Sequence, residues 1–361
     1  MTGRRALLSG WTLVLLLALT IQTSVNVEAL STRAIPKHFY IALGDSYSSG
    51  EGLAPFLAGS GSCDRSPEAY PNIVARRLRT VTLRFLACSG ATIEQISGQV
   101  ASARPSDLRH AALTTVTAGG NDLPFSGLIS SCIGAVASIT SPTIKYLGGM
   151  SGAALCAGTI HGAANLLGAG VNPTTGALSN PVTALTLPLS QPSAIQTRLI
   201  ALYLQILHRE GALRHRVTGP RLIVVPYPTL LGPAGSDACL LSPAPLPNEG
   251  STTTSTPTGS LYPAFANASS VALGQLNSYL QSETSVVVKS LRSEGYLEVS
   301  LAPIEPGFVP LDCSTGTSPS INGLHLNNTA MRALSGFLHP TAAGQALLAA
   351  SVVAAWRSAT H

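Results

Sequence analysis

The sequence predicts an α/β fold in which one parallel sheet of about five strands is covered by helices on both faces. Short apolar runs of strand length alternate along the chain with longer segments of helical periodicity. Such alternation is typical of parallel sheets built from crossover helices. Several of the apolar runs also break abruptly into glycine-containing polar motifs, as strands do at the ligand-binding edge of open α/β sheets.

The expected elements follow from these patterns in chain order. The five expected strands are Phe39–Gly44, Leu83–Cys88, Leu113–Ala118, Leu222–Pro226 and Leu297–Ala302. Segments with apolar residues at three- and four-residue spacing predict helices over Tyr70–Arg79, Ala194–His215, Ser269–Ser293 and Thr341–Arg357. We expect them to form a single domain over residues 30–361.

Two long segments interrupt the alternation of strands and helices. Residues 126–192 are rich in Gly, Ala and Ser, and residues 232–258 are rich in Pro, Ser and Thr. Loops of this length in a compact domain are usually functional or disordered. The first insert is apolar enough to form short helices, so a lid or acyl pocket and an inert surface decoration both remain open.

The N-terminus has the pattern of a secretory signal. Arg4 and Arg5 precede an apolar stretch over Trp11–Ile21, and Val27 and Ala29 are small residues at the two positions that a signal peptidase reads. A membrane anchor is the alternative, but it requires roughly 20 apolar residues, more than the unbroken run provides. We therefore expect residues 1–29 to be removed and the mature protein to be secreted.

Composition limits the classes of partner. Hydrophobic residues make up 45% of the 361 residues, which allows a large core, and charged residues make up 10%. The net charge of +5 comes without a basic cluster interleaved with aromatic residues, so we expect no nucleic-acid partner.

All six cysteines lie beyond the expected signal peptide. An even number in an exported chain favours three disulfides. We expect sequential pairing because each pair would then close one long connection, although the count alone does not select a connectivity. The expected pairs are Cys63–Cys88, Cys132–Cys156 and Cys239–Cys313. A zinc site is the alternative, but no Cys-x-x-Cys or His-x-x-x-His spacing occurs, and we expect neither a metal nor an organic cofactor.

Four short motifs occur in order, each at an expected strand end or loop. They are Gly44-Asp45-Ser46, Ala87–Thr92 (Ala-Cys-Ser-Gly-Ala-Thr), Ala118–Asp122 (Ala-Gly-Gly-Asn-Asp) and Leu338–Gly344 (Leu-His-Pro-Thr-Ala-Ala-Gly). Because the carboxyl ends of parallel strands share one edge of a sheet, Ser46, Gly90 and Asn121 can converge there. A loop before the last helix can bring His339 to the same edge.

This set of residues has the parts that acyl transfer needs. A serine hydroxyl is a weak nucleophile until a base removes its proton, and His339 is the candidate base for Ser46. The reaction places negative charge on the former carbonyl oxygen, which preorganised donors stabilise. The Ser46 and Gly90 backbone N–H groups and the Asn121 side-chain amide are the candidate donors.

In order and spacing, the four motifs resemble those of the GDSL-type hydrolases, also called SGNH hydrolases for the Ser, Gly, Asn and His of the four blocks. The opening Gly44–Gly52, the Ala87–Thr92 block and the six cysteines are most similar to the secreted actinobacterial lipase/esterase branch. The resemblance covers the chain from about Phe39 to its end. It implies a flavodoxin-like α/β/α sandwich that hydrolyses carboxylic esters, with Ser46 as nucleophile, Gly90 and Asn121 as oxyanion donors and His339 as base.

One position departs from the family pattern. The family places an aspartate three residues before the histidine, and Gly336 occupies that position here. We expect no carboxylate near His339 and propose that the Gly336 carbonyl, or one beside it, accepts the Nδ1 proton, as some relatives are understood to do. Asp312 is the alternative group to orient the ring.

The resulting hypothesis is a secreted serine esterase or lipase that acts on lipid or other hydrophobic esters through a Ser–His dyad and an acyl-enzyme. The scarcity of aromatic residues, 5% of the chain, argues mildly against a sugar-binding cleft, but an esterase for carbohydrate acyl groups stays open. A non-catalytic secreted binding protein on the same scaffold is the alternative from another class. We expect a monomer that takes a small-molecule or lipid ester and makes at most transient contact with lipid surfaces.

Overall fold

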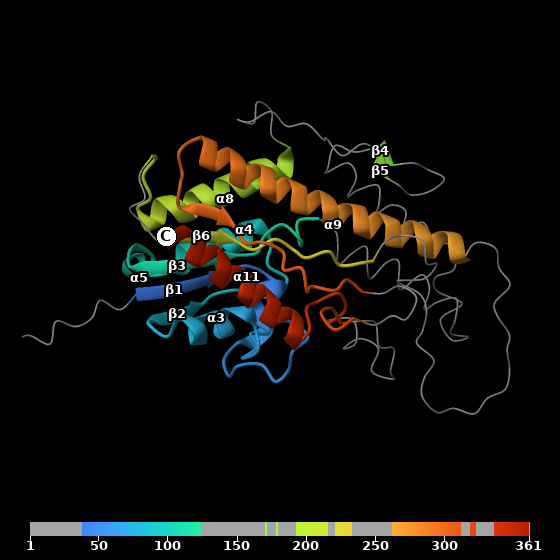
Figure 1. Cartoon of the computed structure of the whole chain (residues 1–361), viewed down its shortest axis with the longest axis horizontal. Helices are drawn as coiled ribbons and strands as arrows, with labels where there is room; N and C mark the ends of the chain where they lie inside the picture. Colours follow the sequence, from blue (N-terminus) through green and yellow to red (C-terminus); the bar gives the residue numbers. More distant parts are fainter. Residues whose placement is uncertain are drawn as a thin grey trace, which may run out of the picture. The chain divides into compact units, whose positions relative to one another are not determined.

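A five-stranded sheet lies at the centre of the computed structural model (Figure 1). Its strands are β1 (His38–Leu43), β2 (Val81–Phe85), β3 (Ala111–Val116), β6 (Arg221–Val224) and β7 (Val299–Leu301). They are ordered β2-β1-β3-β6-β7, and every neighbouring pair is parallel. This is the doubly wound order of flavodoxin-like folds, which confirms the predicted fold class.

The structure describes residues 38–123, 170–171, 178–179, 193–215, 221–232, 262–311, 318–322 and 336–360. These all belong to one compact unit, His38–His361. The expected signal peptide, most of both inserts and four of the six cysteines (Cys132, Cys156, Cys239 and Cys313) lie outside the described residues, as does Asp312.

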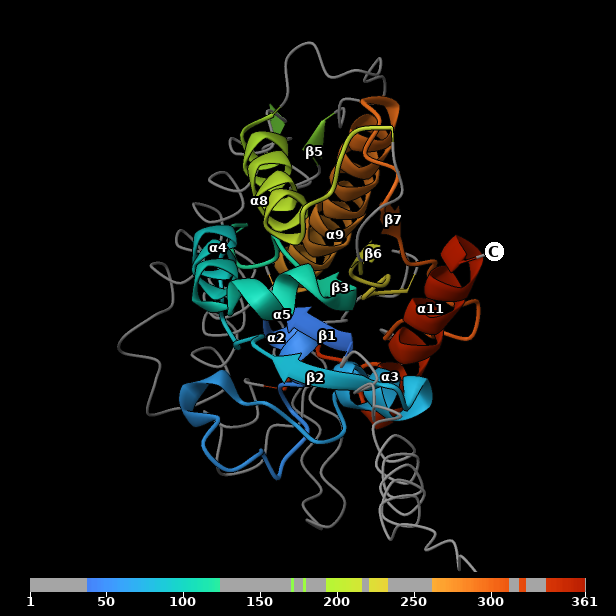
Figure 2. The same ribbon diagram turned by 90° about the vertical axis from the view of Figure 1, so that its left-hand side faces the viewer.

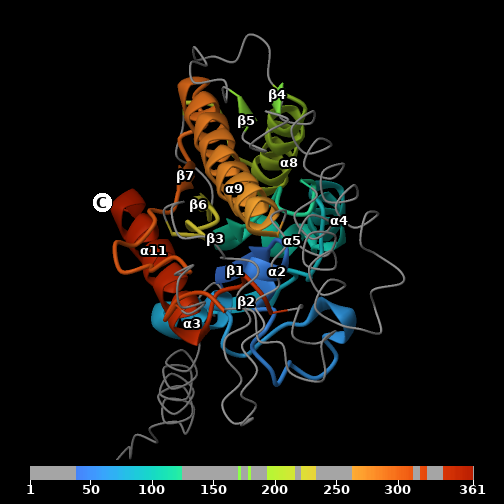
Figure 3. The same cartoon turned by 90° about the vertical axis from the view of Figure 1, so that its right-hand side faces the viewer.

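Helices cover both faces of the sheet (Figures 2 and 3). On one face lie α3 (Tyr70–Leu78) and α11 (Ala342–Thr360), which pack against each other. On the other face lie α4 (Ile93–Ser102), α5 (Pro105–Arg109), α8 (Ala194–Glu210) and α9 (Tyr262–Ser293). The central strands are buried because both of their faces are covered, and Tyr40, Ile41, Ala42 and Leu43 of β1 are fully buried.

Capping interactions and glycine residues set the ends of several helices. A capping box starts α4, in which the Thr92 side chain accepts from the Gln95 N–H and the Gln95 side chain accepts from the Thr92 N–H. The helix expected over Ala194–His215 ends earlier, at Glu210, because Gly211 adopts a φ of 82° there. The helix α9 begins at Tyr262, before its expected start at Ser269.

Besides the helices α4 and α5, a small sheet and two short turns of helix were not among the expected elements. A two-stranded antiparallel sheet of β4 (Gly170–Val171) and β5 (Leu178–Ser179) lies within the first insert. A 3-10 turn, η1, covers Gly61–Cys63, and a one-turn helix, α2, covers Ser46–Ser49. Within the described ranges, no helix combines the length and the apolar character needed to cross a membrane.

The strand register brings the motif-bearing loops to one edge. Leu43 of β1 pairs with Val116 of β3, and Ala42 pairs with Phe85 of β2. Val116 in turn pairs with Val224 of β6. The chain therefore leaves β1, β2, β3 and β6 at the same level, and the residues that follow these strands form one polar cluster.

Candidate active site

The turn after β1 holds Ser46 at the start of α2. Gly44 has a φ of 129°, and a Cβ atom there would lie 2.5 Å from Thr117 Oγ1, so only glycine fits this turn. Asp45 caps α2 by accepting the Tyr47 backbone N–H at 3.1 Å. Ser46 is the first residue of the helix and is 7% exposed. Its backbone N–H has no partner among the described residues.

Asp45 is a fully buried carboxyl that connects three strand ends. It accepts the Thr117 hydroxyl at 2.7 Å and the Tyr227 hydroxyl, and the latter also accepts the Gly120 N–H at 2.9 Å. Burial raises the pKa of Asp45, and these hydrogen bonds and the nearby His339 partly offset that rise. Asp45 therefore fixes the loops around Ser46.

The loops after β2 and β3 bring Gly90 and Asn121 together. The Asn121 side-chain amide donates to the Ala91 carbonyl at 3.2 Å. Gly90 has a φ of 75°, and a Cβ atom built there would have no heavy atom within 4 Å, so the space beside it is open. No described residue accepts the Gly90 backbone N–H. Gly90 and Ser46 thus each present an unused donor at this edge of the sheet, the arrangement that an oxyanion hole requires.

A disulfide and an ion pair support these two loops. Cys63 and Cys88 form the first of the expected disulfides, and the Ser89 N–H donates to the Cys63 carbonyl at 3.1 Å. Asp122 forms an ion pair with Arg198 and accepts the backbone N–H of the first α4 residue at 2.8 Å. Burial raises the pKa of Asp122, and the α4 N–H group and Arg198 oppose that shift.

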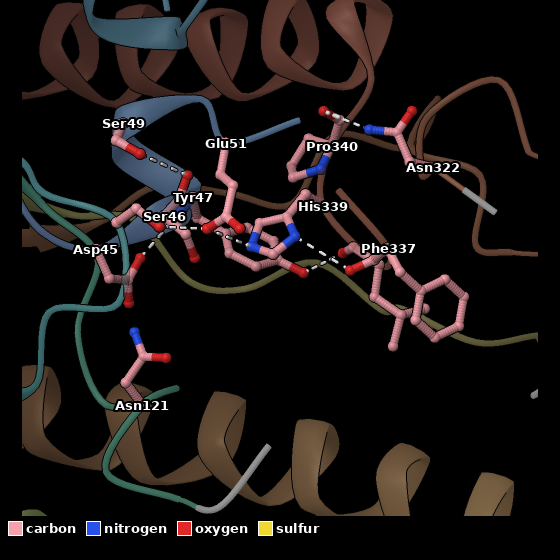
Figure 4. A network of polar contacts seen from close by, with 12 residues as sticks. Asp45, Ser46, Tyr47, Ser49, Glu51, Asn121, Asn322, Phe337, His339 and Pro340 are labelled. Carbon is pink, nitrogen blue, oxygen red and sulfur yellow. Dashed lines mark hydrogen bonds and ion pairs between the residues drawn. The ribbon is translucent and has the colours of Figure 1, made fainter. Parts of the chain in front are cut away.

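His339 lies in a tight turn that packs against the residue after Ser46 (Figure 4). The Tyr47 hydroxyl donates to the Leu338 carbonyl at 2.5 Å, and the Tyr47 and His339 ring centroids are 5.3 Å apart. Leu338 has a φ of 61°, a conformation that costs a non-glycine residue roughly 1–2 kcal/mol. The contact with Tyr47 holds this strained peptide in place and with it the imidazole.

The group that orients His339 is the carbonyl of Phe337, which lies 3.1 Å from Nδ1. The expected group was the carbonyl of Gly336 or one beside it, and in the structure it is the neighbouring carbonyl of Phe337. The Gly336 carbonyl instead accepts the His339 backbone N–H at 3.1 Å, which closes the turn. Because a carbonyl only accepts, Nδ1 carries a proton, and the neutral ring has its free lone pair on Nε2.

The structure corrects the expectation that no carboxylate lies near His339. Glu51 Oε2 lies 3.6 Å from His339 Nε2 and also accepts the Ser89 hydroxyl. The helix α2 lasts one turn and ends at Gly50 with a φ of 82°, and this reversal directs Glu51 back to the sheet edge. The sequence signal was a carboxylate flanked by two glycines directly after the first motif.

Ser46 and Glu51 lie on the side of the imidazole opposite Phe337 (Figure 4). Nε2 faces Glu51 at 3.6 Å, and the described residues include no hydrogen bond between the Ser46 hydroxyl and His339. The structure thus brings all four predicted residues to one edge of the sheet, with the His339 imidazole near Ser46 and its Nε2 facing the Glu51 carboxylate.

Comparison with known proteins assigns the family. The model of the GDSL-like lipase/acylhydrolase family matches residues 42–238, more than half of the chain. The chain belongs to this family.

Among curated proteins, Lipase 1 of Streptomyces coelicolor is 34% identical over 131 residues, which cover 36% of this chain and 47% of that protein. The lipase of Streptomyces rimosus is 37% identical over 105 residues, covering 29% and 38%. The chain thus aligns with less than half the length of these relatives.

Solved structures of the same fold extend over more of the chain. The phospholipase A1 of Streptomyces albidoflavus NA297 superposes with a TM-score of 0.55 at 21% identity, covering 88% of this chain and 98% of that one. The extracellular lipase of Streptomyces rimosus gives a TM-score of 0.53 with the same identity and coverage. At 21% identity, the likeness to these two structures shows that this chain shares their fold.

Proposed function

We propose that this protein is a carboxylic ester hydrolase that uses Ser46 as nucleophile and His339 as general base. The observation that carries the proposal is the shared position of four residues (Ser46, Gly90, Asn121 and His339) at one sheet edge, where the Ser46 and Gly90 N–H groups have no partner among the described residues. Membership of the GDSL-like lipase/acylhydrolase family supports the same reaction class.

In the acylation step the Ser46 Oγ attacks the carbonyl carbon of the ester, and its proton passes to His339 Nε2. The Phe337 carbonyl supports this transfer because it holds Nδ1 in its protonated state. The tetrahedral intermediate carries its negative charge on the former carbonyl oxygen. When it collapses, the ester C–O bond breaks, and the alcohol leaves with the proton from Nε2.

Deacylation repeats these proton transfers with water as the nucleophile. His339 takes a proton from water, the hydroxide oxygen attacks the acyl carbon, and Ser46 recovers its proton as the carboxylic acid leaves. In both steps the oxyanion lies within reach of the Ser46 N–H, the Gly90 N–H and the Asn121 amide. Each such donor contributes about 3 kcal/mol of transition-state stabilisation, or about a hundredfold in rate.

We further propose that the substrates are lipid or other hydrophobic esters and that the protein acts outside the cell as a monomer. The named Streptomyces relatives are lipases, and one of the structural neighbours is an extracellular lipase. The signal-like pattern of residues 1–29 supports export. N-terminal sequencing of the secreted protein tests the expected cleavage after Ala29.

Hydrolysis of p-nitrophenyl acetate, octanoate and palmitate tests both the reaction and the substrate class. The proposal predicts turnover that favours the longer chains and falls by several orders of magnitude in Ser46→Ala. Activity on acetate alone would contradict the lipid assignment and favour a small-ester or carbohydrate esterase. A correctly oxidised protein that is inert on all three esters would favour a binding protein on this scaffold.

A further inference from the structure

Both ring nitrogens of His339 face hydrogen-bond acceptors. Nδ1 lies 3.1 Å from the Phe337 carbonyl oxygen, and Nε2 lies 3.6 Å from Glu51 Oε2. A neutral imidazole carries one proton and therefore leaves one of these acceptors opposite its lone pair. The imidazolium carries a proton on both nitrogens, so it can donate to the Phe337 carbonyl and direct positive charge toward the Glu51 carboxylate. The surroundings of His339 thus suit its charged form, which is the form that the acylation step generates.

Glu51 lies in a mostly buried position, where its electrostatic interaction with a charged His339 is weakly screened by solvent. The two side chains are mostly buried, with exposed fractions of 17% for His339 and 15% for Glu51. The Ser89 hydroxyl donates to the same oxygen, Oε2, that faces Nε2. Because Ser89 precedes Gly90 and follows a disulfide-bonded cysteine, the loop that carries the oxyanion donor also fixes the position of the carboxylate.

Glu51 places a carboxylate near His339 in a chain that has Gly336 where the family pattern has an aspartate. At Gly336 an added Cβ atom would lie 3.2 Å from the Gly52 Cα, so the two glycine backbones pack closely and leave little room for a side chain. The chain segment that occupies this space is the one that carries Glu51, since Gly52 follows it directly. A carboxylate thus reaches the imidazole from the Nε2 side instead of the Nδ1 side.

We propose that Glu51 is a positioning residue that stabilises the His339 imidazolium during acylation and deacylation. The inference rests on the proposed function, because an imidazolium forms only if His339 accepts the Ser46 proton. The separation of 3.6 Å exceeds a hydrogen-bond length, so Glu51 contributes charge stabilisation and leaves Nε2 free to exchange its proton with Ser46 and the leaving alcohol.

Other ionisable groups surround the imidazole. Asp45 is fully buried and interacts electrostatically with His339, and the Tyr47 ring lies beside the imidazole at an interplanar angle of 39°. Burial raises the pKa of Tyr47 well above its ordinary value, and the charges of Asp45 and Glu51 raise it further, so the phenol stays neutral. Glu51 is the carboxylate in direct ion-pair range of Nε2 within the described part of the chain.

The test is the pH dependence of kcat/KM for Glu51→Gln. Glutamine keeps an oxygen for the Ser89 hydroxyl, so the variant removes the charge and retains the local contact. An opposite charge close to an imidazole favours its protonated form. We expect the acidic limb of the profile to move to lower pH and the plateau rate to fall about tenfold.

Two variants serve as controls. Glu51→Asp keeps the charge and is expected to return the limb toward its wild-type position. Glu68→Gln removes an exposed carboxylate and is expected to leave the profile unchanged. A rate that falls by the same factor at every pH in Glu51→Gln, or a profile identical to wild type, would overturn the proposal.

A second measurement does not depend on turnover. The ring of His339 is titrated by NMR in Ser46→Ala and in Ser46→Ala/Glu51→Gln, with His339→Ala to assign the signal. The proposal expects a lower midpoint when the carboxylate is removed; equal midpoints would overturn it. Wild-type protein without esterase activity or Ser46 labelling would refute the proposed function itself, whatever the midpoints show.

Discussion

A buried carboxyl far from Ser46 in the sequence predicts how stability depends on pH. Glu210 is the last residue of α8 and is 4% exposed. The Thr114 hydroxyl donates to its Oε1, while its Oε2 has no partner within the described ranges. Burial raises the pKa of Glu210 from 4.5 to about 8, and the neighbouring Glu298 adds to the rise.

The direction of the effect follows from proton linkage. Between pH 4.5 and about 8 the folded protein holds the Glu210 proton, whereas the unfolded chain has already released it. The stabilisation from this group is therefore complete below the unfolded pKa and is lost as the pH rises through the folded value. Each pKa unit corresponds to about 1.4 kcal/mol, which gives a loss of about 3.5 kcal/mol between pH 5 and pH 8.

Urea unfolding of wild type and Glu210→Gln at pH 5 and pH 8 measures this loss. Glutamine cannot ionise, so the variant is expected to gain about 3.5 kcal/mol relative to wild type between the two pH values. Groups that titrate in both proteins cancel in the comparison, and Glu68→Gln is the exposed control. An equal difference at both pH values, or a relative gain at the lower one, would refute the assignment of a raised pKa to Glu210.

Three further predictions concern the loops around Ser46. Tyr227→Phe removes the hydroxyl that Asp45 accepts and is expected to cost about 2–3 kcal/mol in urea unfolding; an unchanged midpoint would mean that water replaces it. Replacing Cys63 and Cys88 by serine opens a loop with a sequence separation of 25 and is expected to cost about 3 kcal/mol, so a stability equal to wild type under oxidising conditions would contradict that estimate. Gly90→Ala fits the open space beside it but strains a φ of 75°, so kcat is expected to fall about a hundredfold while Tm drops by only a few degrees. A kcat for this variant within twofold of wild type would contradict the proposed role of the Gly90 N–H in the oxyanion hole.

The sheet could be predicted because its signals are local. Each apolar run that ends at a glycine-containing motif became a strand, and the expected and observed strands overlap in all five cases. The helix α4 was missed although Ile93, Ile96 and Val100 lie at helical spacing and are buried. Its capping box at Thr92 and Gln95 was the second available signal.

The arrangement around His339 could be predicted only in part. The motifs indicated which residues gather at the sheet edge, but not how the turns there aim their polar groups. The carbonyl of Phe337 faces Nδ1 because Leu338 adopts a φ of 61°, which its sequence does not indicate. Glu51 reaches Nε2 because α2 ends after one turn at Gly50. Both depend on backbone conformations that tertiary contacts impose.

The measurement that tests the central claim most directly is the rate at which a fluorophosphonate probe labels Ser46, mapped by mass spectrometry. The account predicts rapid labelling of wild type at Ser46, labelling of His339→Ala slower by about a hundredfold or more, and none of Ser46→Ala. Wild-type protein that stays unlabelled, labelling at another serine, or a His339→Ala variant that reacts as fast as wild type would contradict a Ser–His hydrolase.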